Sequence, residues 1–198
     1  VSQPQTIVTA SQETGDVSVM SARVVNAASL SSGQSGTMRI ARVEDADIRI
    51  DGRVDEPIWS EIPAFDRMTV TDPDTLEKPT HKTRTRILYT DKGLYVAGEM
   101  EQPLDTLVER LSSRDEFVNR DDFGISIDSS GEGLYGNFFN IGLGGSKQDG
   151  KIAPERNITT QWDGPWVGET AVTDDGWSAE MFIPWSALSM PDGGIERE

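Results

Sequence analysis

The sequence contains no cysteine among its 198 residues. A disulfide framework, a zinc–thiolate site and a thiol nucleophile are therefore excluded. The lack of cysteine does not exclude an oxidising compartment, because disulfides are an option there and not a requirement.

Basic residues are scarce: 18 Lys and Arg stand against 34 Asp and Glu, a formal net charge of -16. So acidic a chain repels phosphate backbones and anionic membranes, so we expect no nucleic-acid partner. Neutral ligands and divalent cations suit this charge better. The alternative is that the charge only keeps an exported domain soluble.

The one histidine, His81, stands just before an expected strand. A Ser–His pair needs a placed nucleophile and an orienting carboxylate, and no segment resembles a nucleophile elbow. Adjacent carboxylates are frequent, but among 34 acidic residues such pairs arise by chance. A glycosidase needs two carboxylates at a fixed separation, which these pairs do not indicate. The sequence therefore predicts a protein that is not an enzyme.

No apolar run approaches the roughly 20 residues that a membrane-spanning helix needs. The first residues also lack the basic and apolar regions of a secretory signal, so we expect that any signal has been removed. Hydrophobic residues make up 35% of the chain, enough for one core but not over the whole length.

The most regular stretch is residues 83–100, which predicts a β-hairpin. Thr85, Ile87 and Tyr89 alternate with Arg84, Arg86 and Leu88. Leu94 begins a second alternating run. This period of two is typical of a half-buried strand. The residues between the two runs, 90–93, end in Gly93 and favour a turn.

The same pattern of short alternating segments and Asp/Gly turns recurs along the chain. We expect further strands at 47–50, 123–127, 134–143, 157–162, 166–172 and 177–183. Pro57 begins one short helical turn, and apolar residues at i, i+3, i+4 and i+7 from Leu104 to Leu111 predict a second short helix. Many short strands with turn signals between them predict an all-β fold, an antiparallel β-sandwich of jelly-roll-like form with one or two short helices.

The chain divides into two parts. Residues 1–38 are rich in Ser, Gln, Thr, Ala and Gly and lack aromatic residues, so we expect a flexible leader or linker. The alternative is an arm that adds a strand to a sheet. Residues 39–198 form the predicted sandwich.

Loop carboxylates make a calcium site plausible. Calcium takes six to eight oxygen ligands, usually from loops. No EF-hand loop is present, so the predicted donors come from separate segments, namely Asp115, Asp121, Asp122 and Asp149.

The most distinctive cluster is Gln161-Trp162-Asp163-Gly164-Pro165-Trp166. Two tryptophans flank a tight turn and have amide and carboxylate neighbours. Indole faces stack on the C–H faces of sugar rings, and polar groups bind the hydroxyls. Packing of both indoles in the core is the alternative.

Several blocks resemble carbohydrate-binding module family nine. The stretch Ile50–Trp59 (IDGRVDEPIW) is similar to the opening of that family, and later blocks follow in the family's order. These are Leu94-Tyr95-Val96, Asp121-Asp122-Phe123, Gly176-Trp177-Ser178-Ala179-Glu180 and Ile183-Pro184-Trp185. The resemblance covers residues 48–188. Arg114-Asp115, Phe139-Asn140 and residues 161–166 resemble the variant found at the N-terminus of bacterial outer-membrane-associated proteins.

The resemblance implies a β-sandwich that binds sugar without catalysis and often holds calcium. Sugar-binding members clamp a terminal sugar between two tryptophans. The site residues it suggests here are Trp162, Trp166, Gln161, Asn140 and Arg114. It also implies an exported bacterial protein, extracellular or in the periplasm and outer membrane, associated with a membrane barrel in its parent protein.

Three further expectations accompany the resemblance. The family usually adds another strand after the position of Glu198, so we expect a truncated C-terminus. The alternative function is a structural or interaction domain of an outer-membrane-associated protein that has lost sugar binding. Haem-binding relatives need His or Met ligands, and the single histidine disfavours that function.

Overall fold

A computed structural model describes residues 6–12, 19–26, 36–129, 131 and 133–188. The strands in this part of the chain are β1 (Thr6–Gln12), β2 (Val19–Asn26), β3 (Gly36–Arg42), β4 (Thr83–Tyr89), β5 (Gly93–Glu101), β6 (Asp122–Asp128), β7 (Gly136–Gly142), β8 (Lys147–Ala153), β9 (Asn157–Thr159), β10 (Val167–Thr173) and β11 (Gly176–Pro184). The helical segments are α1 (Pro57–Glu61) and the 3₁₀ turns η1 (Leu104–Thr106), η2 (Pro154–Arg156) and η3 (Trp185–Ala187).

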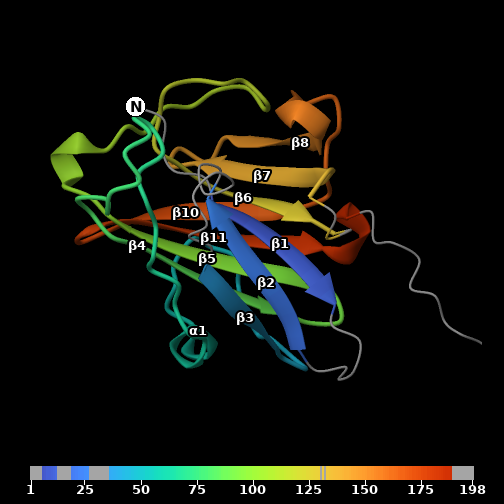
Figure 1. Ribbon diagram of the computed structural model, residues 1–198. Coiled ribbons are helices and arrows are strands. Elements are labelled where there is room, and N and C mark those ends of the chain that lie inside the picture. The colour runs from blue at the N-terminus through green and yellow to red at the C-terminus, as the bar shows by residue number, and fades with distance from the viewer. Residues whose placement is uncertain (1–5, 13–18, 27–35, 130, 132, 189–198) are drawn as a thin grey trace, which may run out of the picture.

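The strands form two layers that share one hydrogen-bonded order. The order is β10-β11-β5-β4-β3-β2-β1-β6-β7-β8-β9. One layer contains β10, β11, β5 and β4, the other contains β6 to β9, and β3, β2 and β1 join them along one side (Figure 1). All pairs are antiparallel except β1 with β6 and β3 with β4. The predicted all-β sandwich, largely antiparallel, is confirmed.

The central hairpin is β4 and β5, as the alternating pattern predicted. The two strands pair from Thr83 with Met100 to Tyr89 with Leu94. The turn closes with a hydrogen bond from Thr90 N to Gly93 O of 2.9 Å. One face of the hairpin enters the core between the layers, and the other lies on the outer side of the sandwich.

The core fills the space between the two layers. Its residues are apolar side chains from alternate positions of β4, β5 and β11 on one side and of β6 and β7 on the other. They include Ile87, Leu94, Val96, Phe123, Ile125, Phe139, Ile141, Trp177, Ala179, Met181 and Ile183. The alternation in the sequence therefore predicted the inward faces of these strands correctly.

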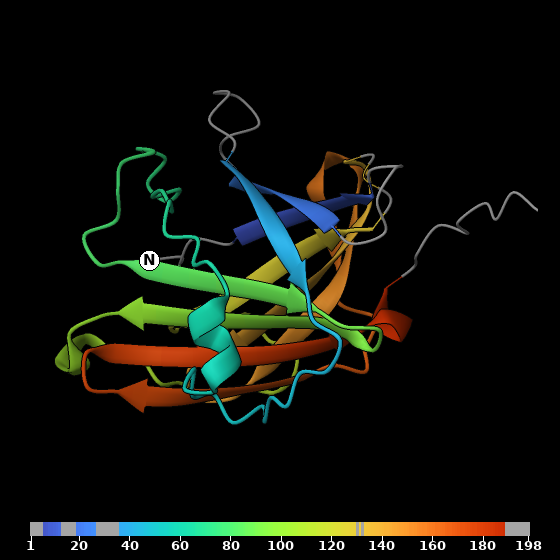
Figure 2. The ribbon, with the colours of Figure 1, turned by 90° about the horizontal axis from the view of Figure 1, so that it is seen from below.

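A second apolar cluster covers the outer face of the β4–β5–β11 layer. Trp59 and Ile62, in and just after α1, pack on Leu88, Tyr95 and Ala97. Figure 2 shows α1 lying across this face. α1 begins at Pro57, as predicted, and its N-cap residue Glu56 makes no side-chain capping bond.

One buried carboxylate holds the segment before α1 on the sheet. Glu180 of β11 accepts hydrogen bonds from Asp51 N and Gly52 N (3.1 Å each) and from Trp59 Nε1 (2.8 Å). Gly52 has φ +85°, and a Cβ there would overlap the backbone of Thr170. The separate sequence blocks at 50–59 and 176–180 are thus one structural unit.

The predicted strand at 47–50 is wrong. These residues lie outside any strand, and Ile48 and Ile50 pack on the outer apolar cluster. Their alternating pattern reflects burial of one side against the sheet without ladder pairing.

The predicted helix at 104–111 is also wrong. The chain forms only η1 and then extends, and Leu111 is 75% exposed. Asp121 accounts for this: its Oδ2 accepts from Val108 N (2.7 Å) and its N donates to Val108 O (3.1 Å). Backbone groups that a helix would use are therefore bonded to a distant segment.

The structure has strands in three segments of the predicted leader: β1, β2 and the first residues of β3, 36–38. Residues 6–12 and 19–26 are β1 and β2, as the alternative of a strand-adding arm would have it. β1 pairs with β6 over Thr6–Thr9, and β3 pairs with β4 at Ala41 and Arg42. These pairings are made by backbone N–H and C=O groups of the strand edges, so the pattern of side chains along the sequence does not predict them. Residues 1–5, 13–18, 27–35 and 189–198 lie outside the described residues, so the domain boundary at residue 39 stays a prediction.

Within the described residues, no helix is long and apolar enough to cross a membrane.

Candidate functional site

The stretch of residues 161–166 lies against one face of β7 and β8. Lys147, Asp149 and Lys151 alternate along β8 and share a face with Phe139, which pairs with Asp149. The Trp162 and Trp166 rings both meet Phe139 edge to face, at centroid distances of 6.0 and 5.7 Å. The polar sequence of 144–151 predicts a loop and not a strand, so the alternation of these side chains toward the tryptophans is found only in the structure.

The loop before β6 brings a second segment to the same place. Asp115 N donates to Lys147 O (3.1 Å), and Asp149 N donates to Asp115 Oδ1 (2.9 Å). Asp115 has φ +62°, a conformation in which Asp is one of the better tolerated residues. Its neighbour Arg114 is thereby placed beside β8 and the 161–166 turn.

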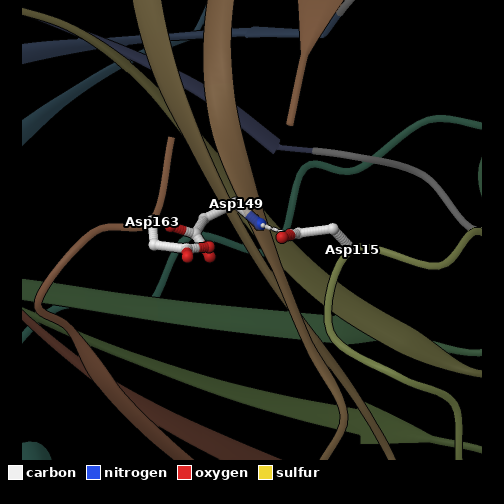
Figure 3. A group of neighbouring side chains, drawn as sticks. All are labelled: Asp115, Asp149 and Asp163. Carbon is white, nitrogen blue, oxygen red and sulfur yellow. Dashed lines mark hydrogen bonds between the residues drawn. The ribbon is translucent and has the colours of Figure 1, made fainter. Parts of the chain in front are cut away.

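Arg114 links three carboxylates. Its Nη2 lies 2.5 Å from Asp149 Oδ1, and its Nε lies 3.0 Å from Asp163 Oδ1 and 4.0 Å from Asp115 Oδ2. Nη2 also donates to Gly164 O (3.3 Å). The Asp149 side chain is 0% exposed, and a buried carboxylate needs such a partner. Figure 3 shows the carboxylates of Asp149 and Asp163 side by side, with Asp115 pointing at the Asp149 backbone nitrogen.

The structure does not bring the four predicted calcium ligands together. Asp115 and Asp149 share a cluster with Asp163, whose ligand atoms all lie within 4.8 Å of one another. Asp121 instead binds Gln102 Nε2 and Val108 N. Asp122 lies on the face of β6 that points away from the core. Burial raises the pKa of its carboxyl, and a hydrogen bond with Asn140 offsets only part of this rise. Successive residues of a strand point to opposite faces, so Asp122 cannot share the inward face of its neighbour Phe123.

The three-aspartate cluster does not fit calcium as it stands. Arg114 already supplies its positive charge. Asp149 Oδ2 accepts from Gly164 N, and Asp115 Oδ1 accepts from Asp149 N. Calcium needs six to eight oxygen ligands, so it would have to displace the guanidinium and these N–H donors.

The two tryptophans differ in exposure. Trp162 is half-buried, whereas Trp166 is 4% exposed and belongs to the core. For Trp166 the structure therefore matches the alternative of core packing and not that of sugar stacking. Trp166 directly precedes β10, and it packs on Phe139 and beneath Lys147, whose Nζ lies 5.1 Å from the ring centre.

The other predicted sugar-binding residues are also divided. Gln161 and Arg114 are exposed beside Trp162 and the turn. Asn140 is 2% exposed and points to the other face of β7, where it donates to Gln148 Oε1 (2.9 Å). Asn140 is one residue out of phase with Phe139, so the alternation already placed it on that face.

Three side chains of the site were not predicted: Lys147, Lys151 and Asp163. Lys151 Nζ lies 5.9 Å from the centre of the Trp162 ring, and Asp163 is exposed in its ion pair with Arg114. Burial lowers the pKa of Lys147, while Glu169 and Asp149 raise it. The i, i+2, i+4 spacing of residues 147, 149 and 151 is the sequence feature that would place these three side chains on one face of a strand.

A separate hollow of about 190 Å³ lies at the end of the β4–β5–β11 layer. Its floor includes the ion pair of Arg84 with Glu101, and its one aromatic residue, Trp177, is buried in the core. It presents no indole face, so the Trp162 surface has the more informative chemistry.

The chain resembles solved structures in fold. It aligns with a family 9 carbohydrate-binding module from Caldicellulosiruptor kristjanssonii in complex with cellotriose, at a TM-score of 0.52 and 17% identity, covering 72% of this chain and 66% of that one. The same kind of module with glucose gives 0.50 and 17%, covering 76% and 70%. A Bacteroides uniformis protein inferred to bind carbohydrate gives 0.56 and 15%, covering 75% and 72%. The chain thus spans about two thirds of these proteins. No protein-family model and no curated protein sequence matches the chain.

Proposed function

We propose that this β-sandwich binds carbohydrate without catalysis, at the surface formed by Trp162, Gln161, Arg114 and Asp163. The observation that carries the proposal is a half-buried indole bordered by exposed polar and charged side chains. A fold shared with modules solved with glucose and cellotriose supports it.

The arrangement suits a sugar for two reasons. The part of the Trp162 ring that Phe139 and the turn leave uncovered can stack on an apolar face of a pyranose ring. Arg114 is already fixed by Asp149, so its guanidinium can donate to sugar hydroxyls with little loss of side-chain freedom. Asp163 and Gln161 supply acceptors and a further donor at the rim.

Binding calorimetry with glucose and cello-oligosaccharides tests this function. Trp162→Ala should remove most of the affinity, since stacking area is the main favourable contribution of a neutral sugar. Trp185→Ala is the matched control, because Trp185 is also half-buried but lies at η3, where its Nε1 donates to Thr90 O. Circular dichroism checks that both variants are folded. Equal affinity in the Trp162 variant and the wild type would contradict the site.

The second candidate is an interaction domain that has lost sugar binding. It is favoured by Leu111 and Phe117, which are large, exposed and in the loop that carries Arg114. Absence of sugar binding, together with loss of a protein partner when Leu111 and Phe117 are changed to Ser, would favour this candidate.

Calcium, export and association with an outer-membrane barrel stay proposals. The sequence resemblance alone supports export and the barrel. Calcium binding would need Arg114 to move, so a rise in melting temperature with calcium chloride but not magnesium chloride would support it.

A further inference from the structure

The charges around Trp162 differ in one respect from those of the whole chain. The chain carries 34 acidic and 18 basic residues. Beside the 161–166 turn basic residues are relatively more frequent: Arg114, Lys147 and Lys151 stand with Asp115, Asp149, Asp163 and Glu169. The site is therefore less acidic than the chain as a whole.

The carboxylates of this group are engaged, whereas one cation is not. Asp149 and Asp163 are paired with Arg114. Lys151 is exposed, and among the described residues no carboxylate lies within ion-pair distance of its ammonium. Its one described contact is with the Trp162 ring, at 5.9 Å from the ring centre.

Besides the Lys151 ammonium, the site has one more hydrogen-bond donor without a described partner, on Arg114. Nε and Nη2 are bound to Asp163, Asp149 and Gly164, and no described residue accepts from Nη1. The site therefore offers an ammonium next to the indole and one guanidinium N–H on the partly exposed Arg114 side chain. Both are hydrogen-bond donors with positive charge.

A ligand that stacks on Trp162 must take Lys151 into account. A neutral sugar that covers the ring displaces the ammonium from its cation–π contact and gives it no charged partner. A sugar with a carboxylate lets the ammonium move from the ring to that carboxylate. Charge-assisted hydrogen bonds of this kind are about twice as strong as neutral ones.

Resting on the proposed function, we propose that the Trp162 site prefers sugars that carry a carboxylate, namely uronic acids, and that Lys151 is the residue that determines this preference. The sugar ring stacks on Trp162, and the Lys151 ammonium and Arg114 Nη1 donate to the carboxylate. No covalent step is involved.

The test compares two ligands that differ only at C6, methyl β-D-glucuronoside and methyl β-D-glucoside, titrated into the wild-type chain at constant ionic strength. We expect the glucuronoside to bind about tenfold more tightly, because its carboxylate adds charge-assisted contacts with Lys151 and Arg114. Lys151→Gln should remove most of this difference, because it takes away the ammonium contact and leaves only Arg114 Nη1 to the carboxylate.

Lys78→Gln is the control, since it removes the same charge from an exposed position in the segment before β4. It should keep the tenfold difference. An equal loss in both variants would assign the preference to long-range charge and overturn the inference. Equal or weaker binding of the glucuronoside would overturn the inference and leave the proposed function standing. If neither ligand binds, both are overturned.

Lys151→Arg gives an independent check, because it keeps the charge. It should retain most of the preference for the glucuronoside, and loss of the preference with glucoside affinity intact would show that charge at this position is not its cause.

Discussion

The buried carboxylate of Glu180 should make the stability of the protein depend on pH. Its side chain is 0% exposed, and burial, its largest influence, raises its pKa to about 7 from an ordinary value of 4.5. Nearby Glu56 adds to the rise, while the N–H groups of Trp59, Asp51 and Gly52 oppose it.

The sign of the effect follows from these two values. A carboxyl whose pKa is higher in the folded state holds its proton more tightly when folded. Its contribution to stability is therefore complete below about pH 4.5 and is lost as the pH rises through about 7. The difference of 2.5 pKa units (7 minus 4.5) corresponds to about 3 kcal/mol of unfolding free energy.

The perturbation is Glu180→Gln, which removes the titration and keeps the shape. Urea unfolding at several pH values between 4 and 8 gives the free energy of unfolding for both proteins. The wild type should lose about 3 kcal/mol more than the variant across this range. Near pH 4.5, where both side chains are neutral, the two proteins should differ least. Glu61→Gln, an exposed change on α1, controls for the loss of one charge and should follow the wild type.

Parallel pH profiles for the wild type and Glu180→Gln would refute this reasoning. They would mean that the three N–H donors keep Glu180 ionised as readily in the folded state as in the unfolded chain.

Three other predictions concern stability and metal binding. Arg114→Met should destabilise the protein by about 3–5 kcal/mol, because it leaves the buried charge of Asp149 unpaired; calcium should raise the melting temperature of this variant more than that of the wild type, as scanning fluorimetry would measure. Gly52→Ala should destabilise by at least about 1 kcal/mol, because φ is positive there and the new Cβ meets the Thr170 backbone; unchanged urea unfolding would contradict this. Trp59→Ala should cost about 3–5 kcal/mol in the same assay, as for other buried aromatic residues, and a loss below 1 kcal/mol would place Trp59 outside the outer apolar cluster.

The sequence predicted the strands whose faces differ sharply in polarity. Ile87, Leu94 and Trp177 each begin or continue an alternation, and the structure buries that face in the core. Turn residues such as Gly93 gave the connection between β4 and β5 for the same local reason. These features depend on residues that are neighbours in the chain.

Errors occurred where distant segments decide the local structure. The periodicity from Leu104 to Leu111 favours a helix, but Asp121 binds the backbone of Val108 and the chain extends. β8 has a polar sequence that predicts a loop, but it pairs with β7. Its Asp149 is fully buried, because Arg114 and the 161–166 turn cover it.

The candidate site was predicted in part for a related reason. The half-buried Trp162 and the exposed Gln161 and Arg114 lie at one place, as a sugar site requires. Both indoles contact Phe139, and Trp166 is buried further beneath Lys147; these contacts between the turn, β7 and β8 are not revealed by spacing along the chain. Lys151 reaches the site through the register of β8 with β7.

The central claim is that carbohydrate binds at Trp162. Its most direct test is a titration of the ¹⁵N-labelled protein with cellotriose, followed through the indole N–H signals of its five tryptophans. We predict a saturable shift of the Trp162 signal and much smaller shifts for the four buried or distant indoles. No shift at saturating sugar, or a shift confined to Trp59, Trp177 or Trp185, would contradict the claim.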